Sequence, residues 1–574
     1  MLAGFGCAIL FSIMALGATA FAQAAASVDT QKRVDAVFAD LGQRTSPGCA
    51  LAVVNGGEIA YQHGYGMANL ENNTPITPDS VFYIASDSKQ FTAFSIALLV
   101  EEGKLSLDDR ISKYFPELPE SVYGEITVDQ LIHHTSGIRE FWTLWELRGE
   151  RVEGPLLQSA FLDMMARQKA LNFKPGDEFM YSNSNYVFLG MLVSRVSGKP
   201  LAEFTAERIF RPLHMDHTAF RPDHTVIVKD RATGYAFRDG QYKIDFTSIE
   251  PTGDGGLMTT VGDLYQWDQN FYHNRLGKGS QELIKLVETP GVTNGGKKLI
   301  YAFGLGVIEY KGLRAVSHNG SYAGYKSYMV RLPQQKFSVI CLCNSDGPNI
   351  APWVLGKKVI DIYLADQLKA EPAKAEPAGA NSNAPGDDKA ISLSEQELAR
   401  HKGTFREEDG TIWKLSVRDG KLVAEVQGTM FSLVPLSPSH FKAVGAPQSV
   451  DLYFPGDQSS KSGSVELQVG QQPRSTLSPI AVAEVTDFSV YTGEYYSKEL
   501  DLLYKIYVAD GKAYVKYSAN NPEMLDPLSP NDFKMRDNSI RFDRDPSGKI
   551  IGFRVDGDGA KNLEFTKVFD LSRP

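Results

Sequence analysis

The chain of 574 residues contains only four cysteines, Cys7, Cys49, Cys341 and Cys343. Their spacing suits neither a zinc site nor a disulfide framework. Cys341 and Cys343 alternate on one predicted strand, so their side chains share a face, and this favours buried packing thiols. A bridge from Cys49 to one of the two stays open as an alternative in an oxidising compartment.

Positive charge is also scarce, because 59 lysines and arginines stand against 69 acidic residues, for a net charge of -10. An acidic protein attracts neither nucleic acid nor an anionic membrane surface, so we expect neither as a partner. Beyond residue 22, no stretch is long and apolar enough to span a bilayer. We therefore expect no stable membrane span once a signal segment is removed.

Residues 1–22 are predicted to be a signal peptide. An apolar run from about Phe5 to Leu16 is followed by small residues that end at Ala22, as in secretory signals. The segment departs from the usual pattern because it has no lysine or arginine before the apolar run. A buried helix or a membrane anchor is the alternative. The prediction for the mature protein is a periplasmic or secreted location.

Residues 30–368 are predicted to form one catalytic domain of the α+β class. Strand-like segments occur at both ends of this region, around residues 48–66 and 303–343, with helical patterns between them. Such an order predicts one antiparallel sheet in which the first and last strands meet. Residues 369–391 are rich in Ala, Pro, Gly, Asn and Asp, which predicts an exposed linker.

The rest of the chain contains an internal repeat of about 90 residues, which divides it into 392–482 and 483–574. Three short patterns recur in the same order in both halves, among them an Asp-Gly-Lys turn at 419–421 and again at 510–512. Each half alternates short strands with such turns, which predicts two small antiparallel β-barrels.

A candidate nucleophile lies at the start of a predicted helix. Ser86 and Lys89 are three residues apart, the apolar run continues from Phe91 to Val100, and Gly103 is placed to end the helix. The spacing puts the lysine amine within reach of the serine hydroxyl. A desolvated lysine can take the serine proton, and N–H groups at a helix start favour an oxyanion. Alone, the pattern also fits a capping serine and a solvated lysine.

Two segments downstream supply further polar groups. A Pro-Gly turn at 175–176 precedes Tyr181 and Asn183. We predict that ammonium groups near Tyr181 favour its anion and make it a usable base. Asn183 can donate to a substrate carbonyl or hold Lys89 in place. As an isolated feature, this segment also fits an ordinary surface turn.

The third segment, residues 317–321, ends a predicted strand. Gly320 lets a substrate lie close to the strand backbone. The N–H of Ser321 is a candidate partner of the Ser86 N–H in an oxyanion hole, and His318 can relay a proton or orient the substrate. A histidine at a strand end is otherwise a structural residue.

Taken together, Ser86–Lys89, Tyr181–Asn183 and His318–Gly320 resemble the ordered motifs of the penicillin-recognising serine hydrolases. This family includes class C β-lactamases, DD-peptidases, esterases and D-aminopeptidases. The resemblance extends over about residues 34–364, with further similar stretches at 131–138, 173–176, 209–215 and 255–264. It implies a β-lactamase/transpeptidase-like fold, an antiparallel sheet with helices on both sides, and a covalent acyl-enzyme at Ser86. It implies no metal and no organic cofactor.

His318 departs from the usual family pattern, in which a lysine takes this place. An imidazole is mostly neutral at pH 7, so it suits a substrate carboxylate less well than a lysine does. The substitution favours esters, or amides recognised by another end. A catalytic domain followed by two small lipocalin-like barrels is similar to the D-aminopeptidases. The barrels could equally be spacer or oligomerisation modules.

These observations lead to one main hypothesis, a serine hydrolase that acts on small amides or esters, with D-aminopeptidase-like activity as its sharper form. A β-lactamase or DD-carboxypeptidase is the enzymatic alternative. A non-catalytic cell-wall or β-lactam sensor is the alternative from another class. A small molecule or short peptide is the expected substrate, and a homo-oligomer is left open.

Overall fold

A computed structural model describes the chain over residues 28–41, 43–150, 154–348, 350–369, 390–407, 411–426, 429–444, 449–454, 463–469, 474–480, 485–517 and 522–568. The predicted signal peptide at 1–22 and most of the predicted linker lie outside these residues. The chain divides into two compact units, Met1–Phe141 with Arg151–Lys374, and Trp142–Glu150 with Ala375–Pro574. Within the described residues, no helix combines the length and apolar character needed to cross a membrane.

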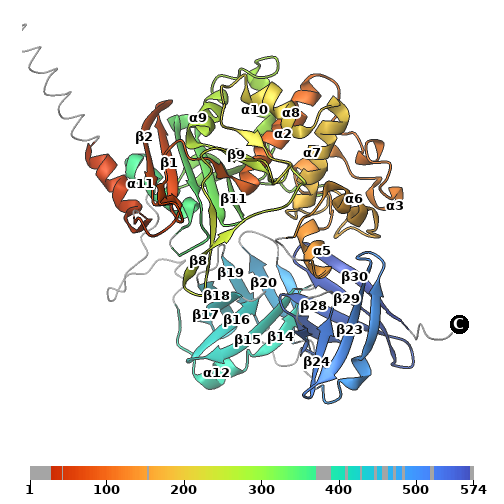
Figure 1. Cartoon of the computed structure of the whole chain (residues 1–574). Helices are drawn as coiled ribbons and strands as arrows, with labels where there is room; N and C mark the ends of the chain where they lie inside the picture. The colour runs from red at the N-terminus through yellow and green to blue at the C-terminus, as the bar shows by residue number, and fades with distance from the viewer. Residues whose placement is uncertain are drawn as a thin grey trace, which may run out of the picture. The chain divides into compact units, whose positions relative to one another are not determined.

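A six-stranded antiparallel sheet forms the centre of the first unit (Figure 1). Its strand order is β10-β11-β12-β13-β1-β2, so the first two strands of the chain lie beside the last four of this unit. The α+β prediction, with its first and last strands in one sheet, is confirmed. The strands are β1 (Cys49–Asn55), β2 (Glu58–Tyr65), β10 (Gly306–Tyr310), β11 (Leu313–Tyr322), β12 (Tyr325–Leu332) and β13 (Phe337–Cys343).

One inner pairing of the sheet joins β1 to β13. Its register places Cys49 opposite Cys343, and the two form a disulfide across 294 residues of sequence. Cys341 is free and buried. The structure therefore contains the disulfide that the sequence left open as an alternative. Of the two cysteines predicted to be buried packing thiols, only Cys341 is one.

Helices cover both faces of the sheet, as expected. On one face, the helix over residues 28–37 and α11 (Pro352–Tyr363) contribute to the buried cluster that contains Leu51 and Val339. Helix α9 (Val261–Asn270) lies on the other face. Ser338, the residue before Val339 on β13, points to that face, and its hydroxyl donates to Asp268 of α9 at 2.8 Å.

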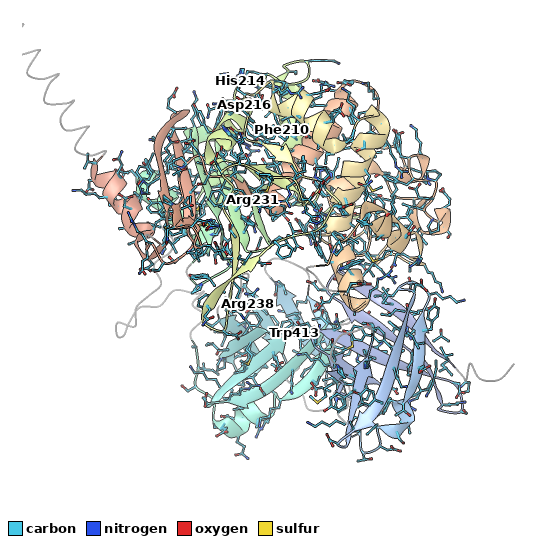
Figure 2. The ribbon with its side chains drawn as sticks, viewed as in Figure 1. Phe210, His214, Asp216, Arg231, Arg238 and Trp413 are labelled. Atoms are coloured by element: carbon cyan, nitrogen blue, oxygen red, sulfur yellow. A yellow bond between two sulfur atoms is a disulfide. The ribbon has the colours of Figure 1, made fainter. Side chains whose placement is uncertain are left out.

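The helix that follows the candidate nucleophile is α2 (Lys89–Glu101), and eleven of its residues are buried. Phe91 of this helix packs against Trp267 of α9, with ring centroids 4.5 Å apart, and against Phe210, one of the residues labelled in Figure 2. Gly103 has a φ of +70°, so it stops the helix where the sequence predicted, in a conformation that favours glycine. The nucleophile segment thus lies on a rigid, buried helix.

The remaining elements of the first unit connect β2 to β10. The helices are α3 (Glu120–Tyr123), α4 (Val128–Ile132), α6 (Gln158–Ala166), α7 (Asn183–Ser197), α8 (Leu201–Thr205) and α10 (Gln281–Val287). The short strands are β3 (Met67–Asn69), β4 (Thr74–Pro75), β5 (Phe82–Tyr83), β6 (Ala219–Phe220), β7 (Gly234–Arg238), β8 (Gln241–Asp245) and β9 (Leu257–Thr259). Thr127 caps α4 in a capping box with Gln130.

The second unit contains two β-barrels. After a short helix, α12 (Glu395–Ala399), eight strands form a closed barrel, β14 (Gly403–Arg406), β15 (Ile412–Arg418), β16 (Lys421–Val426), β17 (Thr429–Ser437), β18 (His440–Val444), β19 (Val450–Tyr453), β20 (Val465–Val469) and β21 (Ser475–Pro479). Trp413, labelled in Figure 2, belongs to the apolar core of this barrel.

Nine strands form the second, nearly closed barrel in the order β25-β24-β23-β22-β30-β29-β28-β27-β26. They are β22 (Gly493–Ser497), β23 (Leu502–Ala509), β24 (Lys512–Lys516), β25 (Glu523–Met524), β26 (Asp526–Pro527), β27 (Asp532–Met535), β28 (Asn538–Arg544), β29 (Ile550–Gly557) and β30 (Ala560–Val568). The Asp-Gly pairs at 419–420 and 510–511 all have φ between 49° and 71°. They form equivalent hairpin turns, so the repeat predicted two barrels correctly.

The second unit also includes a short segment from the middle of the first unit's sequence. Helix α5 (Phe141–Leu147) crosses the division, and Trp142–Glu150 belongs with the barrels. Within the second unit, the Tyr504 hydroxyl donates to the Leu147 carbonyl at 2.6 Å, and the Thr143 hydroxyl donates to the Asp558 carbonyl. The sequence analysis divided the chain into consecutive ranges, so it could not predict that residues 142–150 belong with the barrels.

Candidate active site

The candidate nucleophile lies on a tight turn between a strand and a helix. Strand β5 leads into a 3-10 turn over Ala85–Ser88, which passes directly into α2 at Lys89. Ala85 has a φ of +47°, a left-handed conformation that side-chain-bearing residues rarely adopt and that occurs often at functional sites. Ser86 is half-buried while its neighbours are buried. The turn therefore presents the Ser86 hydroxyl and hides the residues around it.

Lys89 is fully buried beside Ser86. Its Nζ donates to the Ser86 Oγ at 3.0 Å, to the Asn183 Oδ1 at 2.7 Å and to the Asp254 carbonyl at 2.7 Å. These three acceptors match the three hydrogens of an ammonium group. Asn183 thus contacts the lysine, which is one of the two roles that the sequence suggested for it.

Burial lowers the pKa of Lys89 to about 8, and the opposing charges of Asp254, Glu140 and Asp87 raise it only in part. Desolvation disfavours the ammonium form. A lysine with this pKa is neutral often enough near neutral pH to accept a proton from the hydroxyl 3.0 Å away. Lys89 is therefore the best-placed base for Ser86.

Tyr181 lies over the same lysine, with the Lys89 Nζ 5.0 Å from its ring centroid. Its hydroxyl approaches Ser86. Although 36% of the residue is exposed, desolvation around its hydroxyl raises the pKa of Tyr181 well above the usual value. The prediction that nearby ammonium groups favour the Tyr181 anion is wrong, because burial disfavours the anion and the charges of Asp254 and Glu140 raise the pKa of Tyr181 further. A protonated Tyr181 can pass a proton but is not the resting base.

His318 belongs to β11 and is held at both ring nitrogens. Nδ1 lies 2.7 Å from the carbonyl of Asn319, and Nε2 lies 3.0 Å from the Tyr301 hydroxyl. Because a carbonyl only accepts, Nδ1 carries the hydrogen and Nε2 accepts from Tyr301. Burial, with the charge of Lys89, lowers the pKa of His318 to about 3. The imidazole is thus neutral and already hydrogen-bonded on both sides.

Gly320 brings the same strand against the nucleophile turn. A Cβ at this position would lie 2.1 Å from the Ile84 carbonyl and 2.9 Å from the Ser86 nitrogen, so only glycine permits this approach. The pairing of β10 with β11 ends at Ser317, so it does not extend to Ser321. The oxyanion role of the Ser321 N–H stays a prediction.

Four residues in this region were not found from the sequence. Tyr301 and His134 pack with Tyr181, at centroid distances of 6.0 and 4.4 Å. The Glu140 carboxylate accepts from the Asn183 N–H at 2.5 Å. Asp254 lies in the Gly-rich stretch 253–256 and contacts Lys89 through its carbonyl. Asp254 directly precedes the similar stretch 255–264, and His134 lies within the stretch 131–138. No local signal distinguishes Tyr301 and Glu140.

The described residues contain one cluster of side chains with metal-ligand geometry, Cys49, Cys341 and Cys343. Two of the three are joined in the disulfide, and all three lie in the buried core. The Ser86 region has no comparable cluster in the described part of the chain. The expectation of no metal and no cofactor stays a prediction.

Comparisons with known proteins identify the family of this chain. The Beta-lactamase family model matches residues 34–352. Penicillin-binding protein 4* of Bacillus subtilis is 27% identical over 437 residues, which cover 72% of this chain and 91% of that protein. A D-aminopeptidase of Brucella canis is 30% identical over 369 residues, which cover 62% of this chain and 68% of that protein.

A solved structure, the octameric penicillin-binding protein homologue from Pyrococcus abyssi, matches with a TM-score of 0.53 at 25% identity, over 78% of this chain and 99% of that one. The fold and the Ser86–Lys89 geometry define a serine hydrolase. The chain belongs to the Beta-lactamase family.

Proposed function

We propose that this protein is a D-aminopeptidase-like serine hydrolase, which releases N-terminal D-amino acids from short peptides, amides or esters. The observation that carries the proposal is the neutral state of His318, held between Tyr301 and Asn319. D-aminopeptidases 30% identical to this chain support it.

In the proposed reaction, Lys89 in its neutral form takes the proton of Ser86 as the serine oxygen attacks the substrate carbonyl. The N–H groups of Ser86 and Ser321 stabilise the oxyanion. The C–N or C–O bond to the leaving group then breaks, and that group receives the proton from Lys89 through the Tyr181 hydroxyl. Water attacks the acyl-enzyme, Lys89 and Tyr181 return its proton to Ser86, and the free amino acid leaves.

The state of His318 separates this proposal from a β-lactamase or DD-carboxypeptidase. Both of those activities involve substrates with a free carboxylate, which a permanent cation at this position would bind. A histidine with a pKa lowered to about 3 by burial supplies no such charge at neutral pH. The site thus favours substrates that place no carboxylate group near His318.

A substrate panel on the full chain tests the proposal. We expect D-alanine p-nitroanilide to be cleaved with a higher kcat/KM than its L-enantiomer or a chromogenic cephalosporin, and Ser86→Ala to abolish all turnover in a folded protein. Faster hydrolysis of the cephalosporin than of every aminoacyl substrate would overturn the proposal in favour of a β-lactamase.

The proposed location is the periplasm or the cell exterior. The predicted signal at residues 1–22 supports it, and so does the disulfide between Cys49 and Cys343, since such bonds persist in oxidising compartments. Release of the protein by osmotic shock, with a mature N-terminus near residue 23, tests the location. The octameric state of the Pyrococcus abyssi homologue makes a homo-oligomer part of the proposal, which light scattering on purified protein tests.

A further inference from the structure

Asp254 lies against the candidate active site on a loop whose backbone is tightly fixed. Gly253 has a φ of +123°, and a Cβ there would lie 2.3 Å from the Tyr186 carbonyl of α7. On the other side, a Cβ on Gly255 would lie 2.5 Å from the Tyr83 hydroxyl. The residue between them is therefore positioned by close backbone contacts with two elements of the site.

The backbone oxygen of Asp254 is close to the nucleophile. One ammonium group, that of Lys89, contacts both this oxygen at 2.7 Å and the Ser86 hydroxyl at 3.0 Å. The two oxygens are consequently within about 6 Å of each other. The Asp254 carboxylate is also close enough for its charge to raise the pKa of both Lys89 and Tyr181.

The Asp254 side chain is only half-buried, and it forms no ion pair within 4 Å among the described residues. Its charge nevertheless acts on the site. Burial raises the pKa of Asp254 to about 6, while Lys89 is the largest opposing influence. After desolvation, Asp254 is also the largest charge that raises the pKa of Tyr83. A carboxylate in this state gains from a cation that arrives from solvent.

Glu140, another carboxylate near Lys89, differs from Asp254 in its surroundings. It is 8% exposed, and its Oε2 accepts from the N–H of Asn183, the first residue of α7. Glu140 thus fixes the start of a helix, whereas Asp254 is only half-buried. Among these two acidic groups, Asp254 is the one available to a ligand.

We infer that the Asp254 carboxylate binds the free α-ammonium group of the substrate, and that it selects aminoacyl substrates over acylated or carboxylate-bearing ones. In an aminoacyl substrate the ammonium is two bonds from the carbonyl carbon, so it stays near Lys89 and Asp254 when that carbon is next to Ser86. When Lys89 is protonated, its charge and that of the substrate ammonium group repel each other, and the negative charge of Asp254 compensates this repulsion. The same negative charge repels a substrate carboxylate. This inference rests on the proposed function, because it assigns the recognition of its substrate.

The test compares Asp254→Asn with wild type on a charged and a neutral substrate. The asparagine keeps the size of the side chain and removes its charge. We expect kcat/KM for D-alanine p-nitroanilide to fall about 10- to 100-fold, the range for a charge-assisted hydrogen bond. The loss for the neutral ester p-nitrophenyl butyrate should be much smaller, because the ester has no ammonium group and shares with the anilide only the effect of Asp254 on Lys89. Asp216→Asn, at an exposed aspartate labelled in Figure 2, is the matched control and should leave both substrates unchanged.

A second measurement separates this inference from the proposed function. D-Alaninamide should inhibit ester hydrolysis competitively in wild type, N-acetyl-D-alaninamide should not, and Asp254→Asn should raise the inhibition constant of D-alaninamide at least tenfold. These inhibition constants are measurable even if no aminoacyl substrate is turned over. Such a lack of turnover would contradict the proposed function but not the role of Asp254 in binding. An equal loss for ester and anilide, or an unchanged inhibition constant in Asp254→Asn, would overturn the role of Asp254.

Discussion

The contact between Gly320 and the nucleophile turn gives the sharpest prediction, for the substitution Gly320→Ala. The added Cβ would lie 2.1 Å from the Ile84 carbonyl, 2.6 Å from the Ser327 hydroxyl and 2.9 Å from the Ser86 nitrogen. The serine hydroxyl can rotate away, but the other two atoms are backbone. Ordinary contacts of this kind begin near 3.4 Å, so β11 must retreat from the turn by roughly 1 Å.

A displacement of this size matters because oxyanion donors act only within about 2.7–3.1 Å of the developing charge. The loss of one such donor reduces kcat by about 10²- to 10³-fold. We expect Gly320→Ala to lower kcat/KM for p-nitrophenyl butyrate by at least about 10²-fold. The same overpacking should reduce the free energy of unfolding by about 1–3 kcal/mol.

Steady-state ester hydrolysis, together with intact-mass detection of the acyl-enzyme, measures whether acylation is the affected step. Gly306→Ala is the matched control, because Gly306 lies on the neighbouring strand β10 and its nearest atom would be the Ser317 carbonyl at 3.3 Å. That variant should keep activity within about threefold of wild type. If Gly320→Ala had wild-type activity and stability, the close approach of β11 to Ser86 would be refuted.

Three further predictions follow from the fold and the site. Because neutral Lys89 is the base and burial lowers its pKa to about 8, kcat/KM for a neutral ester should rise with pH and level off above about 8; a rate that is flat from pH 6 to 9 would exclude this role. Removal of the disulfide by Cys49→Ala with Cys343→Ala should lower the free energy of unfolding by about 2–5 kcal/mol, measured by denaturant titration, and an unchanged midpoint would contradict the bridge. A chain that ends at Leu368 should bind ANS and aggregate, because the α5 segment belongs with the barrels; a monomeric product that binds no dye would contradict that assignment.

The sequence predicted the parts of this structure that depend on local patterns. The helix stop at Gly103 and the repeated Asp-Gly turns each follow from a few adjacent residues, and both are confirmed. The spacing of Ser86 and Lys89 likewise placed their side chains 3.0 Å apart. Each of these features is set by chain geometry over one or two turns.

The electrostatic state of the site could not be predicted in the same way. The anion expected at Tyr181 could be excluded only with knowledge of its burial and of the charges of Asp254 and Glu140, which together raise its pKa. The partner of His318 is Tyr301, which has no motif around it and reaches the site through tertiary packing. Protonation states depend on burial and on distant residues, and neither is written in a local pattern.

The pairing of β1 with β13 has a consequence for the order in which the molecule is assembled. The β1–β2 hairpin is synthesised early, but the inner edge of β1 finds its partner only after nearly 300 further residues have emerged. Until then that edge exposes unsatisfied backbone groups and a row of apolar side chains, which invite aggregation. We expect a nascent chain of this protein to depend on chaperones until β13 arrives, and its sheet to form late and slowly.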